Sequence, residues 1–432
     1  MKFIKKNKYF ELRNFFILWG TQSLSQLGSS ITGFALTLWL YEKTGSTLSA
    51  AALTICSYAP YVLMSIFAGA LSDRFDKRKT MLGCDLFAAI CTILILVLFR
   101  TNHLRTWHLY ALNAVSGLMN TIQQPASEVA MTLITPEKYY QKTSGLRSLS
   151  RSLISILNPL IATALYSFSG LNGIIAVDLG SFIVASTALL FLVKIPEMKN
   201  DRGERILVLA REGLVFLRET PLIMALILFM CGVNLVASAF DAALPGYVLP
   251  NPNGGSSILG IVTACSGVAM VIGSLIASVL PKSKDRVKII YLTMLFSLGT
   301  ENFLLAFSRE PVLWCIGQMI GWLPVPIMSA NLDVILRNNI PVELQGRVYA
   351  CRNTFQFFTI PIGLFAGGFM VDHVCEPFMR SYGNLPVLKM LFGTGKSSGA
   401  ALMMLILGIS GSLICIITGR KLRKYQYNES KL

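Results

Sequence analysis

Amide and hydroxyl side chains recur at helical spacing inside two otherwise apolar stretches of the sequence. In the first stretch, intervals of three and four residues place four of them on one face of a helix: Gln22, Ser25, Gln26 and Ser29. The second stretch carries Asn113, Asn120, Gln123 and Gln124. A polar stripe is costly in hydrocarbon unless it faces a cavity or another helix. We expect these groups to line a cavity in which they hydrogen-bond a small molecule, and a helix–helix contact remains the alternative.

Four carboxylates also lie in or at the edge of apolar stretches: Glu128, Asp178, Asp241 and Glu301. A carboxylate in a medium of low dielectric can alternate between a charged and a neutral form, so the chemistry expected of it is proton binding and release. Asp241 is the first candidate because its neighbours from Val233 to Leu249 are uncharged. An interhelical hydrogen bond, or a position at a water-filled outer mouth, is the alternative for Asp241. Asp178 and Glu301 are weaker candidates for the same chemistry.

Glu128 has a structural alternative of its own. The sequence places it near the end of its apolar stretch, and the next stretch begins with Arg147 and Arg151. A carboxylate beside two guanidinium groups is expected to form an ion pair. The second half of the chain adds four more candidates for the lining of a cavity: Asn234, Gln318, Trp322 and Gln356.

The composition indicates that these residues sit in membrane helices. The 432 residues are 53% hydrophobic and only 14% charged, with a mean hydropathy of +0.60, which is too apolar for a soluble globule. A span needs about 20 mostly apolar residues. We therefore expect an all-α integral membrane protein with twelve spans, at about 15–41, 47–71, 80–99, 107–133, 146–168, 171–193, 222–249, 257–280, 288–307, 312–336, 347–372 and 399–419.

The net charge of +16 is explained by its distribution. The 38 lysines and arginines gather in alternate connections, and the remaining connections hold only Lys43, Arg100, Arg105, Arg309, Arg380, Lys389 and Lys396. Positive charge favours the cytoplasmic side of a membrane. Both termini are therefore expected in the cytoplasm of a multi-pass protein of the cell membrane, in contact with lipid. Nucleic acid is not needed to explain the charge.

Neither a metal site nor a bound cofactor is expected. The three histidines are scattered over the expected outer loops. The run 393–397 resembles part of a phosphate loop, but Met390 stands where the first glycine would be. Of nine cysteines, only Cys375 is expected to face outward, in or beside a long outer loop over 373–398, and it has no external partner for a disulfide.

The two halves of the sequence repeat each other. Gly273 lies 204 positions after Gly69, and Pro361 lies 202 positions after Pro159. We expect a first six-helix bundle over 1–193, a cytoplasmic linker with an amphipathic segment over 194–221, and a second six-helix bundle over 222–432. In parallel repeats of this kind, the substrate site lies between the halves near mid-membrane.

The short basic connection after the second span carries the most specific motif. Its residues Gly69, Asp73, Arg74, Lys77 and Arg78 follow the loop signature Gly-x-x-x-Asp-Arg-x-x-Arg-Arg/Lys, so the chain resembles the major facilitator superfamily. More narrowly, the segments 34–45, 69–78, 178–182, 341–348, 376–379 and 391–396 resemble the bacterial macrolide-efflux-type drug exporters. The resemblance implies the major facilitator fold and a gating role for the five motif residues, with a simple topology signal as the alternative. The superfamily's span-four arginine falls at Asn113, and its antiporter glycine before Pro159 falls at Asn158.

The resemblance implies a transporter rather than an enzyme. The expected function is proton-coupled efflux of an amphipathic, macrolide-like drug by alternating access. The protein is expected to act as a monomer that binds a small-molecule substrate and protons. Export of an endogenous metabolite such as a siderophore or lysolipid is the alternative. A non-transporting membrane receptor or scaffold is a further one, although it would not need a polar cavity at mid-membrane.

Overall fold

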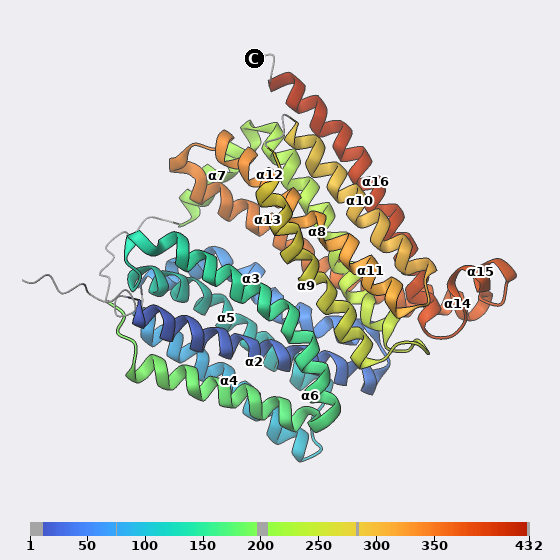
Figure 1. The fold of residues 1–432 in the computed structure, drawn as a ribbon, viewed down its shortest axis with the longest axis horizontal. Coiled ribbons are helices and arrows are strands. Elements are labelled where there is room, and N and C mark those ends of the chain that lie inside the picture. The colour runs from blue at the N-terminus through green and yellow to red at the C-terminus, as the bar shows by residue number, and fades with distance from the viewer. Residues whose placement is uncertain (1–11, 75, 197–205, 282–284, 430–432) are drawn as a thin grey trace, which may run out of the picture. The chain divides into compact units, whose positions relative to one another are not determined.

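The computed structural model describes residues 12–74, 76–196, 206–281 and 285–429, and these residues form helices and short connections without a β-strand (Figure 1). Nine helical segments of the described chain are long and apolar enough to cross a membrane. The all-helical expectation is confirmed, and the count of twelve spans stays a prediction. Two further helices, with 32 and 28 residues, carry the polar stripes, which explains why apolarity alone does not select them.

The chain divides into two compact units. The first comprises residues 1–36 and 56–203, and the second comprises residues 37–55 and 204–432. The boundaries expected for two bundles and a linker stay a prediction. The segment 37–55, which spans the turn between the first two helices, is grouped with the second unit.

In the part of the chain that the structure describes, the first unit is built from five helices and one short 3₁₀ turn. Their bounds are α2 (Arg13–Thr44), α3 (Thr47–Arg74), α4 (Lys77–Arg100), α5 (Thr106–Leu133), the turn Glu137–Tyr139 and α6 (Tyr140–Phe191). The C-terminal end of α2 and the N-terminal end of α3 belong to the second unit. A buried apolar cluster joins α2, α4, α5 and α6 through residues such as Phe15, Met81, Ala126 and Leu189. This cluster fixes the helices whose other faces carry the polar stripes.

Helix α6 contains a break at Gly170. Its φ of 59° and ψ of −160° are outside the helical region, so the residues before and after it form two separate helical stretches. Glycine adopts a positive φ without the steric penalty that other residues incur. The expected boundary between spans 146–168 and 171–193 falls at this glycine.

The second unit is built from the remaining helices. They are α7 (Ile206–Glu219), α8 (Pro221–Val248), α9 (Ser256–Val279), α10 (Arg286–Phe307), α11 (Pro311–Trp322), α12 (Pro324–Asn339), α13 (Val342–Phe369), the π-helical segment Met370–Cys375, α14 (Glu376–Tyr382), α15 (Pro386–Phe392) and α16 (Ser397–Glu429). Helix α8 packs against α13 and α16, and α10 also packs against α16. The span expected over 312–336 is interrupted at Leu323, because Pro324 has no backbone N–H to continue the hydrogen-bond ladder.

Helix α7 forms within the expected linker and packs on α13. Gly213 faces the backbone of Arg347 so closely that a Cβ at Gly213 would collide with its carbonyl oxygen. Glu212 pairs with Arg347, and Leu217 is fully buried. This amphipathic helix is therefore fixed to α13 by packing and by the Glu212–Arg347 ion pair, in addition to its covalent connection to α8.

Two expectations for the outer loop need correction. The segment 373–398 is not an extended loop, because it continues α13 through a π-helical turn and then forms α14 and α15. Cys375 is buried, with 1% of its surface exposed, and does not face solvent. The sequence pattern misled because α14 and α15 are only seven residues each and lack the length of a span.

Candidate substrate cavity

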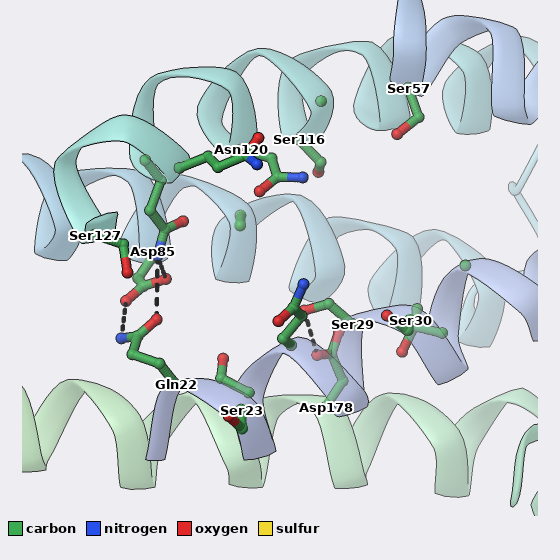
Figure 2. A pocket seen from close by; sticks show the side chains of 18 of the residues that line it. Gln22, Ser23, Ser29, Ser30, Ser57, Asp85, Ser116, Asn120, Ser127 and Asp178 are labelled. Carbon is green, nitrogen blue, oxygen red and sulfur yellow. Dashed lines mark hydrogen bonds between the residues drawn. The ribbon is translucent and has the colours of Figure 1, made fainter. Parts of the chain in front are cut away.

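The first unit contains a partly open polar cavity of about 520 Å³, which is lined by residues of α2, α3, α4, α5 and α6. It is lined by most of the residues that the sequence singled out in this half: Gln22, Gln26, Asn113, Asn120, Gln123, Gln124, Glu128 and Asp178. Figure 2 shows side chains from several helices pointing into this space. The two polar stripes therefore meet around one cavity, which accounts for their position inside apolar helices.

Asp85 on α4 is the residue that the sequence analysis missed. Its carboxylate is bound by two amides that the analysis did predict: Gln123 Nε2 donates to Oδ1 at 2.6 Å, and Gln22 Nε2 donates to Oδ2 at 3.4 Å (Figure 2). Gln123 also donates to Gln22 Oε1 at 3.5 Å. Side chains from two other helices thus converge on this carboxylate, and Asp85 is only 6% exposed. The signal that could have found it is the acid itself, because Asp85 lies alone among apolar residues of the span expected at 80–99.

Asp178 on α6 is the second carboxylate of the cavity. Ser29 Oγ donates to its Oδ1 at 3.0 Å, and Thr92 Oγ1 donates to its Oδ2 at 3.3 Å. Gly28 makes this approach possible, since a Cβ there would come within 3.3 Å of Asp178 Oδ1 and collide with Ser181. Asp178 therefore sits at a close helix–helix contact and holds α2, α4 and α6 together.

Glu128 is the third carboxylate, and it is paired. Arg147 and Arg151 each place a guanidinium Nη2 close to Glu128 Oε1, at 3.0 and 3.1 Å. The ion pair considered from the sequence is present. Asp85 and Asp178, in contrast, form no ion pair with any residue that the structure describes. Among the residues that the structure describes, two basic and three acidic side chains line the cavity, so the net formal charge of this lining is negative when all are ionised.

The amide of Asn113 is turned onto its own helix, where Nδ2 donates to the carbonyl oxygen of Leu109 at 3.0 Å. This position is the one at which the superfamily resemblance would place an arginine. One turn further along α5, Gly117 packs against the backbone of Ser57 so closely that a Cβ would collide with the Ser57 carbonyl oxygen. Both Ser57 and Gly117 line the cavity at this contact between α3 and α5.

The remaining site candidates belong to the second unit. Asp241 is exposed on α8, whereas Glu301 on α10 is buried, with one carboxylate oxygen that has no partner among the described residues. The carboxylate of Glu301 occupies the space that a Cβ at Gly321 would need. Gln318 on α11 is buried, and Trp322 at the end of α11 is half-buried.

Asn234 and Gln356 join α8 to α13. Asn234 Nδ2 donates to the backbone carbonyl of Gln356 at 3.2 Å, and the Gln356 side chain is buried. This bond is a helix–helix contact within the second unit. A role for either residue in substrate binding stays a prediction.

The basic motif is described only in part. Gly69, Asp73 and Arg74 lie in the last turns of α3, where the structure does not describe side chains. Arg78 donates through Nε to the carbonyl oxygen of Leu189 at 2.9 Å and through Nη2 to that of Leu190. A cation is favourable at the C-terminal end of a helix, which here is the end of α6. Lys77 at the start of α4 is buried. The gating role of these five residues stays a prediction.

A family comparison decides the fold family. Residues 18–250, more than half of the chain, match the model of the Major Facilitator Superfamily. The chain belongs to the major facilitator superfamily. It is accordingly a multi-pass membrane transporter with this helical fold, as the loop signature indicated.

Several curated members of the superfamily are similar in sequence. Macrolide efflux protein A of Streptococcus pyogenes is 27% identical over 371 residues, covering 83% of this chain and 90% of that protein. Macrolide efflux protein A of Enterococcus faecalis is 27% identical over 323 residues, covering 72% and 98%. The multidrug efflux pump Tap of Mycolicibacterium fortuitum is 22% identical over 358 residues, covering 80% and 86%. The resemblance to macrolide-efflux proteins is confirmed.

Solved structures of other transporters share the fold. The nucleoside transporter NupG superimposes with a TM-score of 0.68 at 11% identity, covering 94% of this chain and 98% of that one. A bacterial homologue of the iron transporter ferroportin, in an inward-facing state, gives a TM-score of 0.63 at 17% identity, covering 93% and 99%. At these identities the likeness concerns the fold alone.

Proposed function

We propose that this protein exports an amphipathic, macrolide-like compound across the cell membrane in exchange for protons. The observation that carries the proposal is the polar cavity of the first unit, in which amides and hydroxyls from five helices line a space of about 520 Å³. A compound with an apolar body and several oxygen or nitrogen groups is the kind of ligand that such a lining binds. The similarity to macrolide efflux proteins supports this substrate class.

Carboxylates in the membrane supply the means of proton coupling. Asp241, Asp178, Glu301 and Glu128 are the candidates named from the sequence, and Asp85 joins them. One proton entering down about 150 mV releases roughly 3.5 kcal/mol. That free energy supports an outward substrate gradient of about 300-fold, at about 1.4 kcal/mol per factor of ten. One carboxylate that exchanges protons is therefore energetically sufficient.

Transport into inverted membrane vesicles tests the proposal. Vesicles that contain the protein should accumulate a radiolabelled macrolide when an inside-acid pH gradient is imposed, and should lose it when a protonophore collapses the gradient. Vesicles without the protein are the control. Accumulation that is unchanged by the protonophore would contradict proton coupling, and the absence of accumulation for every macrolide in a panel would contradict the substrate class.

Export of an endogenous metabolite is the second candidate function. The described lining contains more amides and hydroxyls than bases, and its two arginines are already paired with Glu128. This charge distribution disfavours a strongly anionic cargo. Competition of cell-extract fractions against macrolide transport in the same vesicles would reveal a metabolite that uses the same cavity.

A further inference from the structure

A smaller cavity of about 250 Å³ lies in the second unit, at the side that the distribution of charges predicts to be extracellular. Its lining comes from the turn between α2 and α3, the π-helical end of α13, α14 and the residue that precedes α16. Helix α14 packs against α16 here (Figure 1). All lining residues fall within 37–55 and 204–432, which form the second unit. The cavity is therefore separate from the polar cavity of the first unit.

Glu376, the first residue of α14, is a buried acid in the lining of this cavity. Only 9% of its surface is exposed, and its Oε1 has no hydrogen-bond partner among the described residues. The same carboxylate accepts a hydrogen bond from the backbone N–H of Gly399 in the first turn of α16. A buried carboxylate oxygen without a donor is costly. Glu376 therefore favours a ligand that brings a positive hydrogen-bond donor.

Asp372, the second acid of the cavity, is already occupied. Its carboxylate accepts hydrogen bonds from Ser46 Oγ and from the backbone N–H groups of Thr47 and Leu48. These three donors leave Asp372 with little to offer a ligand. Glu376 is thus the acid of this cavity that has an acceptor to spare.

Two cationic side chains also line the cavity. Arg380 lies on α14, Lys396 directly precedes α16, and neither side chain forms a hydrogen bond or a direct ion pair with another described residue. Glu376 and Arg380 are four residues apart, so they share one face of α14 about one helical turn, or roughly 5 Å, from each other. The two bases disfavour a simple cation, and the two acids disfavour a simple anion. The charges together fit a ligand that carries both signs.

We propose that this cavity binds a small zwitterion whose ammonium group lies within about one helical turn, or roughly 5 Å, of its anionic group. The ammonium group donates to the Glu376 carboxylate, and Arg380 and Lys396 hold the anion. The parallel N–H groups of an arginine match a carboxylate or a phosphate. A free α-amino acid has this chemistry, and so does the phosphoethanolamine headgroup of a lipid.

The size of the cavity separates this ligand from the exported compound. Its volume of about 250 Å³ is below the range of roughly 300–1,000 Å³ that is usual for drug-sized ligands. A macrolide-like compound is therefore too large for it. The inference goes beyond the proposed export function and does not depend on it.

Calorimetric titration of the purified full chain tests the inference. The protein is placed in nanodiscs of phosphatidylglycerol, a lipid without an amine, and L-alanine is compared with ethylamine and with propionate. Alanine carries both charges, whereas each of the other two probes carries one. The wild-type protein should bind alanine about 10- to 100-fold more tightly than either, because each smaller probe lacks one charged hydrogen bond. Glycine and L-serine are titrated as further amino acids.

Substitutions assign the binding to two side chains. Glu376→Gln keeps an oxygen for the N–H of Gly399 and removes the charge, and Arg380→Gln removes the cation from an exposed position. Each should weaken alanine binding at least about tenfold. Glu310→Gln and Lys389→Gln are the matched controls, because both residues are exposed and neither lines this cavity. The controls should bind alanine as the wild type does, and size-exclusion chromatography checks the folding of all four variants.

Nanodiscs that also contain phosphatidylethanolamine identify the source of the zwitterion. If a free amino acid is the ligand, alanine should bind with the same affinity in both kinds of nanodisc. If the lipid headgroup occupies the cavity, this lipid should weaken alanine binding by competition. It should also raise the melting temperature of the wild type but not that of Glu376→Gln, since a ligand stabilises only the protein that binds it. Either pattern supports a zwitterion site.

Three results would overturn the inference. If ethylamine or propionate binds as tightly as alanine, the site takes a single charge and the zwitterion is wrong. If alanine keeps its affinity for both Glu376→Gln and Arg380→Gln, it binds elsewhere. If no amino acid binds and phosphatidylethanolamine does not stabilise the wild type, the cavity holds only water. None of these results bears on the proposed export function, because the titrations involve no transport.

Discussion

The carboxylate of Asp372 accepts a hydrogen bond from the backbone N–H of Leu48 at 2.9 Å, although 324 residues separate them in sequence. The same carboxylate accepts from the backbone N–H of Thr47 at 3.1 Å and from Ser46 Oγ at 2.7 Å. Thr47 and Leu48 begin α3, whose first turn has no acidic residue of its own. An acid from the π-helical end of α13 thus supplies the N-terminal cap of α3.

Removing this remote cap should destabilise the protein. Asp372→Ala leaves two backbone N–H groups at the start of α3 without their acceptor, and the loss of a cap costs about 0.5–2 kcal/mol. The apparent melting temperature in detergent should fall. Ser46→Ala removes one of the three bonds to Asp372 and also the bond that Ser46 Oγ accepts from the backbone N–H of Ser49 at 3.0 Å. It leaves the N–H groups of Thr47 and Leu48 bound to Asp372, so it should cause a smaller drop. Equal melting temperatures for Asp372→Ala and the wild type would show that water replaces the carboxylate at no cost.

Asp372→Ala should also change transport. The sequence-based boundary assigns Leu48 to the first half of the chain, whereas the structure groups it with the second unit. A transport cycle that moves residues 1–193 as one body has to break the bond between Asp372 and Leu48. The variant should therefore exchange substrate faster than the wild type in counterflow. A slower exchange with unchanged binding would contradict this expectation.

Asp241 is expected to couple proton movement to efflux. It is exposed on α8 and has no charged neighbour between Val233 and Leu249. Protonation removes a charge that costs about 2.5–3.5 kcal/mol at mid-membrane, enough to bias a two-state equilibrium by roughly 100-fold. Asp241→Asn should abolish efflux driven by a pH gradient while substrate binding and counterflow continue.

A matched carboxylate serves as the control for Asp241. Asp333 on α12 is half-exposed and lies 3.7 Å from Arg352. Asp333→Asn should leave pH-driven efflux within about twofold of the wild type, since asparagine keeps an oxygen acceptor beside Arg352 and the side chain of Asp333 is half-exposed. If the Asp241→Asn protein still accumulates substrate against its gradient under a pH gradient, Asp241 has a structural role.

Gly321 and Glu301 should be coupled in stability. The Glu301 carboxylate fills the space beside Gly321, and Ser297 Oγ donates to the Gly321 carbonyl oxygen at 2.5 Å. Gly321→Ala should cost about 1–3 kcal/mol, because overpacking forces a buried side chain to move. The double variant Gly321→Ala with Glu301→Ala should recover part of that loss. Gly180→Ala, where a Cβ meets nothing within 4 Å, should not lower the melting temperature.

Thiol labelling of intact cells should establish orientation. Cys375 is buried and should react slowly with a membrane-impermeant maleimide, so it cannot serve as the reporter expected from the sequence. Val387 on α15 is 67% exposed, and Val387→Cys should react from outside without permeabilisation. Lys194→Cys, an exposed position beyond α6, should react only after permeabilisation. Labelling in the reverse order would overturn the orientation expected from the charges.

The polar lining of the cavity was predictable because the spacing of its residues along the sequence matches the period of a helix. Gln22 and Gln26 repeat at helical intervals, so one face of a helix follows from the sequence, and the structure places that face on the cavity. Asp85 was not found because a single acid has no period, and its importance comes from the approach of Gln22 and Gln123 on two other helices. A sequence pattern along one helix does not contain the packing that brings three helices together.

The errors in the outer segment have a similar cause. Cys375 has polar neighbours in Asp372, His373 and Glu376, which are typical of an exposed loop, yet a π-helical turn carries α13 onward and buries the thiol. Glu376 meets the backbone of α16 where Gly399 has no side chain to prevent it. Such a contact depends on a helix that begins more than 20 residues later in the chain, so local composition does not predict it.

The docking of α7 on α13 has a consequence for biosynthesis. The ribosome completes α7 well over 100 residues before it completes α13. Gly213 and Leu217 are therefore synthesised long before Arg347, the residue of α13 that Gly213 contacts. During that interval, the growing chain presents an amphipathic helix without its final partner. Chains of this length fold by parts in the order of synthesis. The contact between α7 and α13 therefore forms late in synthesis. Premature termination before α13 should leave α7 accessible to chaperones and proteases.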